Sequence, residues 1–261
     1  MKNLLAFLSL FFLLSIYFNL LPIIFSMSDV IRMVHILLFF PLAYLLAKQF
    51  HLRGLDMYGL VRFKGWRKNL LLGYLTGFVA WAVLFSMYLY FGKLEFQGIK
   101  GINDSMLSLV VILFAFGTGS IINDMIVRGL VFYHFKNRVP ILVLFSLTLV
   151  FYAFDDIWYA GFTIQNTIFS LVLGLSLTYA FYKTNSIWAN TGIHFGLNTV
   201  YGLFYGVTGK AGDGIFVVTQ NQSIASWIGW ISTLIAFLMF IVVLITIKFY
   251  SRNNNEIRGK A

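Results

Sequence analysis

The sequence contains no cysteine, and this absence removes several kinds of chemistry at once. Without cysteine the chain has no disulfide, no thiolate nucleophile and no cysteine-ligated zinc. Proline is also scarce, with three in 261 residues. Two of them, Pro22 and Pro41, fall inside long apolar runs, where each is expected to kink a helix.

Charged residues are equally few. They make up 11% of the chain, whereas soluble domains carry about a quarter. Hydrophobic residues reach 60%, and the mean hydropathy is +0.85. These values indicate a membrane protein whose length is filled by spanning helices, with no room for a separate soluble domain. We attribute the net charge of +10 to basic residues that set the orientation in the membrane and contact the lipid bilayer. Nucleic acid is not an expected partner.

The apolar runs predict an all-α fold, a polytopic membrane helix bundle of about eight transmembrane helices. The predicted spans are 4–25, 29–48, 69–91, 106–135, 139–157, 163–182, 186–206 and 226–248. The first run resembles a signal peptide but lacks a small-residue cleavage site, so it is expected to remain as the first helix. The fourth run would measure about 45 Å as one helix. Its part beyond Arg128 is therefore expected to tilt or to lie along the cytoplasmic interface.

Basic residues alternate between the loops, and this alternation predicts the orientation. The stretch 49–68 is rich in Lys and Arg, and in an eight-span bundle it lies on the same side as Lys2 and the C-terminal tail. Both termini of this multi-pass protein should then face the cytoplasm from the cell membrane. The predicted organisation has four parts: the first two transmembrane helices with the basic cytoplasmic loop (1–68), a core (69–206), the last transmembrane helix (207–250) and a disordered tail (251–261).

A polar run, Asn123 to Gly129, interrupts the fourth span. Asp124 and Arg128 are four residues apart, so they share one helix face and can form an ion pair. Charges in lipid are costly unless they pair or line a polar cavity, and by default they mark function. A structural ion pair that pins helices together is the competing interpretation.

Two later positions add to this pattern. His194 and Asn198 share a face of the seventh span, and both can donate hydrogen bonds to a carbonyl or a developing oxyanion. Interhelical hydrogen bonding is the alternative interpretation. Asp155 and Asp156 end the fifth span. A solvated pair there would be inert, whereas an inward Asp155 could act as a base or as a metal ligand.

Taken in order, these residues resemble the motifs of the CAAX protease and bacteriocin-processing family of intramembrane endopeptidases. That family has EExxxRG, FxxxH and HxxxN. This sequence has Asn123-Asp124-x-x-x-Arg128-Gly129, Phe151-x-x-x-Asp155 and His194-x-x-x-Asn198. Between them, Phe169-x-x-x-x-Gly174 and Thr184-Asn185-Ser186-Ile187-Trp188-Ala189 resemble the family's glycine-containing helix and the turn after it. The resemblance implies an intramembrane-protease-like core over 69–206, with Asp124, Asp155, His194 and Asn198 as its catalytic set.

The departures from the family pattern concern water activation. In the family, the first Glu and the second-motif His are taken to activate the attacking water, and the last His and Asn to stabilise the oxyanion. Here the two water-activating positions hold Asn123 and Asp155. Asparagine cannot act as a base. The oxyanion positions, His194 and Asn198, keep the family's residues. Because the water-activating positions differ from the family, the site is expected to be degenerate.

Two functional hypotheses follow from this pattern. In the leading one, the degenerate site binds a hydrophobic peptide or a membrane-protein partner, in bacteriocin self-immunity, peptide maturation or scaffolding. The alternative is an active endopeptidase that cleaves a lipidated or hydrophobic peptide with Asp124, Asp155 and His194 rearranged, with or without a divalent metal ion. No other cofactor is expected. A small transporter would also explain buried polar residues, but the sequence lacks paired inverted repeats with broken helices.

Overall fold

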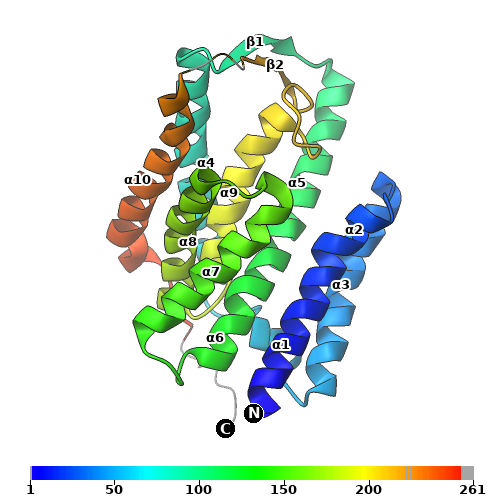
Figure 1. Cartoon of the computed structure of the whole chain (residues 1–261), viewed down its shortest axis with the longest axis vertical. Helices are drawn as coiled ribbons and strands as arrows, with labels where there is room; N and C mark the ends of the chain where they lie inside the picture. Colours follow the sequence, from blue (N-terminus) through cyan, green and yellow to red (C-terminus); the bar gives the residue numbers. More distant parts are fainter. Residues whose placement is uncertain (1, 222, 224, 254–261) are drawn as a thin grey trace.

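The computed structural model describes residues 2–221, 223 and 225–253, and its long helices run side by side along the longest axis (Figure 1). At the N-terminus, α1 (Lys2–Ser15) passes through a π-helical turn, η1 (Ile16–Leu20), into the short α2 (Leu21–Ile24). Helix α3 (Asp29–Gln49) then returns beside α1. Pro22 stands in the first turn of α2, and Pro41 lies inside α3.

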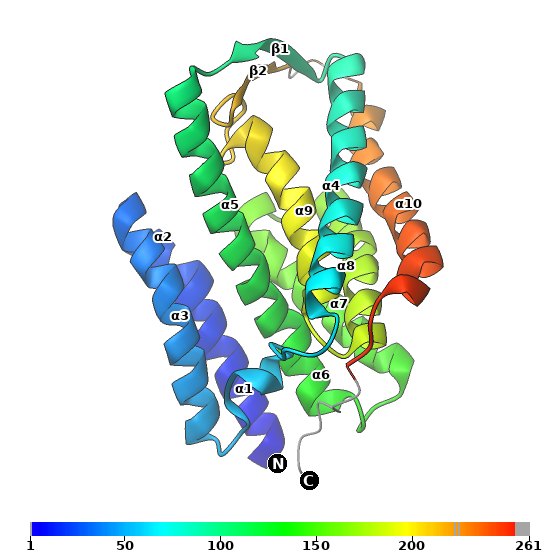
Figure 2. The ribbon, with the colours of Figure 1, turned by 180° about the vertical axis from the view of Figure 1, so that it is seen from behind.

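The remaining helices build the larger part of the bundle, and α9 lies at its centre. After the 3-10 turn η2 (Gly54–Tyr58) they are α4 (Trp66–Tyr90), α5 (Ile102–Asp124), the π-helical turn η3 (Met125–Gly129), α6 (Leu130–Phe135), α7 (Ile141–Ala160), α8 (Ile164–Thr184), α9 (Trp188–Tyr205), the 3-10 turn η4 (Ser226–Trp230), α10 (Ile231–Thr246) and the 3-10 turn η5 (Ile247–Phe249). Figures 1 and 2 show α9 between α4, α5 and α8, and it contacts all three.

Helices α4 and α9 approach each other at backbone distance because glycine occupies their contact. The four glycines are Gly73 and Gly77 on α4 and Gly192 and Gly196 on α9. A Cβ atom added at any of them would collide with backbone atoms of the other helix. Small residues allow this close approach between membrane helices, where van der Waals packing drives association. The contact fixes α9, which carries His194 and Asn198, in the middle of the bundle.

A two-stranded antiparallel ribbon corrects the all-α prediction. Strand β1 (Leu94–Ile99) follows α4, and β2 (Phe216–Gln220) follows α9. Both connections emerge at the same end of the bundle, where the strands pair across its top (Figure 1). Leu94 and Val218 are the buried residues of the two strands, and the other strand residues are partly or fully exposed. The ribbon was missed because its strands are short and belong to separate loops that meet only in the fold.

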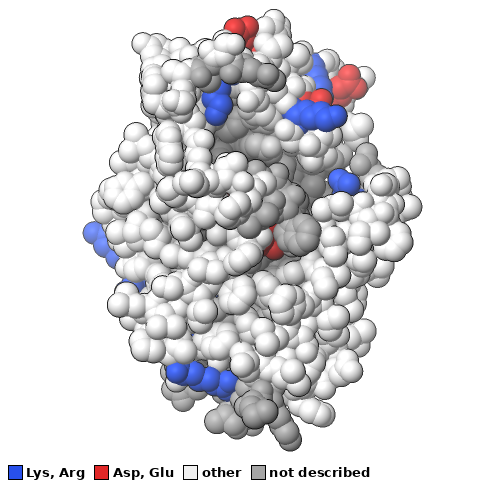
Figure 3. All heavy atoms as spheres, viewed as in Figure 1, with Lys and Arg blue, Asp and Glu red and all other residues white. Residues whose placement is uncertain are grey.

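Six helical segments are long and apolar enough to cross a membrane among the residues that the structure describes: Leu4–Ile24, Val30–Gln49, Trp66–Tyr90, Ile102–Phe135, Ile164–Thr184 and Ser226–Phe249. Helices also occupy the other two predicted spans, as α7 and α9, but neither is among the six. The face in Figure 3 is mostly uncharged, with a few charged side chains near its margins and one acidic side chain near its middle. A polytopic helical membrane bundle is thus confirmed, whereas eight crossings and cytoplasmic termini stay predictions.

The segment after Arg128 is packed inside the protein, and its expected tilt or position along the cytoplasmic interface stays a prediction. Residues Leu130 to His134 of α6 are buried, and α6 contacts α1, α7 and η2. Gly129 permits this packing, because a Cβ atom there would collide with the carbonyl group of Tyr58 in η2. The basic stretch 49–68 therefore folds back and covers α6 instead of leaving it at the surface.

The beginning of the predicted disordered tail is ordered. The backbone N–H of Ser251 donates to Oδ1 of Asn69 at 2.8 Å, and that of Asn253 donates to the carbonyl of Thr184 at 2.9 Å. Asn253 is buried. The rest of the predicted tail, 254–261, lies outside the described residues. The four-part division of the chain stays a prediction.

Candidate functional site

The first motif lies where α5 changes into the π-helical turn η3. Asn123 and Asp124 end α5, and Arg128 belongs to η3. A π-helical turn brings residues five apart onto the same face, in addition to the usual neighbours four apart. Nη1 of Arg128 accordingly donates to Oδ1 of Asp124 at 2.7 Å and to Oδ1 of Asn123 at 3.1 Å. One guanidinium nitrogen thus holds both residues of the motif.

Asp124 is the centre of the buried network. Besides the ion pair with Arg128, its Oδ2 accepts a hydrogen bond from Oγ1 of Thr191 at 2.8 Å, and Nδ1 of His194 lies 3.8 Å from the same oxygen. Both charged side chains are 0% exposed. The predicted pairing of Asp124 and Arg128 is confirmed. Removing one partner of such a buried pair costs about 3–5 kcal/mol, so the pair holds α5 and η3 in place against α9.

The Arg128 guanidinium also lies on an aromatic ring. Its Cζ is 4.3 Å from the ring centroid of Tyr152 on α7, a cation–π contact. The Tyr152 ring in turn meets the His194 ring edge to face, with 6.1 Å between centroids. This stack joins helices α7 and α9 to the ion pair. It also shields one face of the guanidinium, whose Nε and Nη2 make no hydrogen bond within the described part of the chain.

Asp155 points into the protein and is not solvated. Its place near a helix end had left both arrangements open. It is 5% exposed, and Asn19 of η1 donates from Nδ2 to its Oδ1 at 2.8 Å. Asn123 donates from Nδ2 to its other oxygen, Oδ2. The neighbouring Asp156 turns away and accepts a hydrogen bond from Ser170 on α8. The two adjacent carboxylates therefore serve different helix contacts.

The last motif reaches the same cluster from α9. Asn198 donates from Nδ2 to Oγ of Ser120 on α5 at 3.3 Å, one turn before Asn123. His194 is nearly buried, and its Nδ1 faces Asp124. The interhelical hydrogen bond that was the competing interpretation for this motif is therefore present. All four predicted catalytic residues belong to one cluster formed by α5, η3, α7 and α9, together with η1.

The cluster's carboxylates are occupied by hydrogen-bond donors. Asp124 accepts from Arg128 and Thr191, and Asp155 accepts from two asparagine amides. Over the residues that the structure describes, no group of three or more His, Asp or Glu side chains is placed to hold a metal ion. The donor set does not fit a divalent cation, because a cation would have to displace Arg128 or N–H groups that point at the same oxygens.

Several residues of the cluster were not predicted from the sequence. They are Asn19, Ser120, Tyr152, Ser170 and Thr191. Asn19 carried a usable signal, because it is an amide inside the apolar first span, and intramembrane polar residues usually face a partner. Its partner lies 136 positions away, and no local pattern connects the two.

The comparison with protein-family models returned one description. Residues 105–200 match type II CAAX prenyl endopeptidase Rce1-like proteins. This segment is similar to that family. It contains the whole polar cluster except Asn19, because all three motifs fall between Asn123 and Asn198. The comparisons with curated proteins and with solved structures gave no match. The three motifs of the candidate site therefore all lie within the segment that is similar to this family.

Proposed function

We propose that the protein binds a hydrophobic peptide or a segment of a membrane protein without hydrolysing it. The observation that carries the proposal is the side chain of Asn123. Its N–H donates to Asp155 while its oxygen accepts from Arg128. Both sides of this amide are used within the cluster. Asn123 cannot take a proton from water, and both oxygens of Asp155 already accept hydrogen bonds.

The groups that remain accessible are suited to binding. Asp124 and Asp155 are buried, while Asn123 and Asn198 are only partly buried. Each of these amides has two N–H groups and donates one of them within the cluster, so the second can donate to a peptide carbonyl and orient a ligand. The ligand class follows from the bilayer, since a peptide that reaches this cluster between helices has to be apolar or lipidated. Self-immunity to a bacteriocin, assistance in peptide maturation and scaffolding of a membrane partner are all compatible with such binding.

An active endopeptidase is the second candidate, and one observation favours it. Asp124, Asp155 and His194 are buried close together, and the partly buried Asn198 lies one turn from His194 on α9, as in a catalytic set. The close engagement of Asp124 with Arg128 weighs against this function, because an ion-paired carboxylate is a poor base. The binding function therefore stands as the proposal.

The experiment uses the purified full chain in lipid nanodiscs with a fluorescent farnesylated peptide. Binding is followed by fluorescence anisotropy, and the molecular mass of the recovered peptide is measured by mass spectrometry. The proposal predicts saturable binding and an intact peptide, with and without chelator. Asn198→Ala should weaken binding by roughly two- to tenfold, the equivalent of one hydrogen bond. Cleavage that His194→Ala abolishes would instead establish the endopeptidase.

A further inference from the structure

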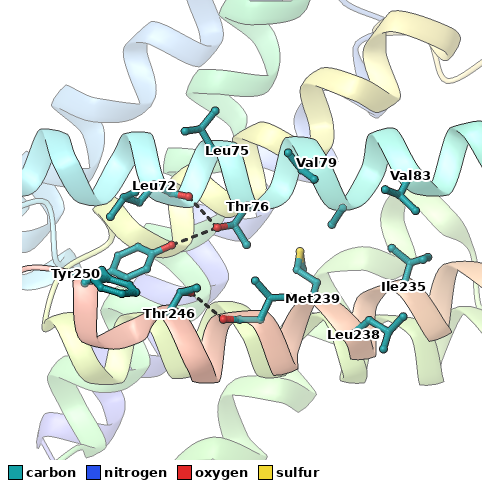
Figure 4. A pocket seen from close by; sticks show the side chains of 13 residues that line it. Leu72, Leu75, Thr76, Val79, Val83, Ile235, Leu238, Met239, Thr246 and Tyr250 are labelled. Carbon is teal, nitrogen blue, oxygen red and sulfur yellow. Dashed lines mark hydrogen bonds between the residues drawn. The ribbon is translucent and has the colours of Figure 1, made fainter.

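A groove runs between α4 and α10 on the outside of the bundle, and none of its lining residues belongs to the polar cluster (Figure 4). Its volume is about 490 Å³, within the usual range of ligand sites. The walls are mostly aliphatic, and they include Leu75 and Val79 from α4 and Leu238 and Val242 from α10. These four side chains are between 45% and 58% exposed, so the groove is open along the side that hydrocarbon would touch.

One end of the groove carries hydroxyl groups. Tyr250 points its hydroxyl at Oγ1 of Thr76, 3.5 Å away, and Thr246 lies beside them (Figure 4). The other end, at Val83 and Ile235, is entirely aliphatic. The groove therefore has the polarity of a lipid, with an apolar body and one end able to form hydrogen bonds.

Positive charge lies at the hydroxyl end. The ammonium group of Lys248 is 5.2 Å from the ring centroid of Phe249, which lines the groove. Lys68 is exposed and stands one helical turn before the lining residue Leu72, on the same face of α4. Two hydrogen bonds between Asn69 and Ser251, both 2.8 Å, hold the start of α4 against the chain after α10. Neither α4 nor α10 contains an aspartate or glutamate.

We infer that the α4–α10 groove binds an anionic phospholipid, with an acyl chain along its walls and the headgroup at Lys248 and Lys68. Basic side chains next to a membrane helix attract anionic headgroups. A protein helix is a poorer fit, since contacts between membrane helices favour small residues. The α4–α9 contact has four glycines, whereas no glycine lines this groove, whose small residues are Thr76, Ala80 and Thr246.

The chain has no cysteine, so a single bimane label can report on the groove. We would place it at Leu75→Cys in phosphatidylcholine vesicles and compare quenching by brominated phosphatidylglycerol and brominated phosphatidylcholine. The matched control is Leu38→Cys, an exposed leucine in the middle of α3. Each lysine should contribute a roughly fivefold preference for the anionic lipid at Leu75, and Leu38 should show little.

Replacing both lysines, Lys248→Gln with Lys68→Gln, should bring the preference at Leu75 down to that of the control. Three results would overturn the inference. Equal quenching by both lipids at Leu75 would mean that the groove does not select anionic lipid. A preference that survives both replacements would mean that the lysines do not bind the headgroup. A label protected from both lipids would mean that a protein segment fills the groove. None of these results depends on the chemistry of the polar cluster.

Discussion

Asn123 and Asp155 occupy the positions that correspond, by the resemblance, to the water-activating pair of the CAAX protease family, and they contact each other. Their identities are coupled by charge. A carboxylate at position 123 would face Asp155 in a medium of low dielectric, where two like charges disfavour each other. The amide avoids this repulsion and supplies a donor. The pair is therefore a self-consistent alternative to a Glu–His pair in the packing of the cluster.

This coupling gives a compensation experiment. Asn123→Asp should destabilise the protein by roughly 1–3 kcal/mol for the lost hydrogen bond, with further loss from repulsion. Adding Asp155→Asn restores one carboxylate and one amide in exchanged positions, so most of the stability should return. Thermal unfolding in detergent measures both variants. A double variant that is less stable than Asn123→Asp alone would show that the two side chains are not coupled.

The Asp124–Arg128 pair predicts a second coupling. Arg128→Ala leaves a buried carboxylate without its partner and should cost about 3–5 kcal/mol, seen as a low folded yield. Asp124→Ala combined with Arg128→Ala removes both charges and should be milder than the sum of the single changes. A double-mutant cycle of unfolding temperatures tests this. Strict additivity would contradict the ion pair.

At the scale of elements, the α4–α9 contact positions the site, and its glycines can be tested singly. Gly77→Ala places a methyl group against the backbone carbonyl of Ile193. Overpacking of this kind costs about 1–3 kcal/mol. Gly119→Ala on α5 is the matched control, because the nearest atom to its new methyl group, on Phe18, would be 4.0 Å away. Folded yield and unfolding temperature should fall for Gly77→Ala and stay unchanged for the control. Equal losses would remove the special role of the close contact.

Helices were the part of the fold that the sequence could predict. The run 29–48 became Asp29–Gln49, and 69–91 became Trp66–Tyr90, because long apolar runs leave little choice inside a bilayer. Contacts between distant segments could not be predicted. The pairing of β1 with β2 and the burial of α6 under η2 depend on where loops and turns meet.

In the candidate site, too, residues paired by local helical spacing could be predicted, whereas contacts between distant segments could not. The first and last motifs were visible because helical spacing puts Asp124 with Arg128, and His194 with Asn198, on common faces. The inward turn of Asp155 was not visible, since its donors Asn19 and Asn123 belong to other helices. Two π-helical turns, η1 and η3, contribute Asn19 and Arg128, and hydrophobic periodicity gives no sign of such turns.

At the scale of the whole molecule, the orientation in the membrane is the main prediction. Asp56 in η2 and Asp213 after α9 are both exposed, and the segments that hold them lie toward opposite ends of the bundle (Figures 1 and 2). Single cysteines, Asp56→Cys and Asp213→Cys, can be labelled in intact cells with a membrane-impermeant maleimide. The positive-inside distribution predicts that only position 213 reacts before permeabilisation. Labelling of both from one side would contradict this orientation.

The central claim is that the polar cluster binds but does not hydrolyse, and the rate of peptide cleavage tests it most directly. The wild-type chain and the double variant Asn123→Glu with Asp155→His would be incubated with one farnesylated peptide in nanodiscs. The variant carries the residues that the similar family has at its water-activating positions, while His194 and Asn198, the predicted oxyanion donors, are unchanged.

If the polar cluster binds without hydrolysis, the wild-type chain should show no cleavage above a protein-free control. The double variant should show measurable cleavage, which His194→Ala should lower by about 10²–10³-fold, as expected for loss of an oxyanion donor. The binding function would be contradicted if the wild-type chain cleaves the peptide and if Asp155→Ala abolishes this cleavage at unchanged folded yield.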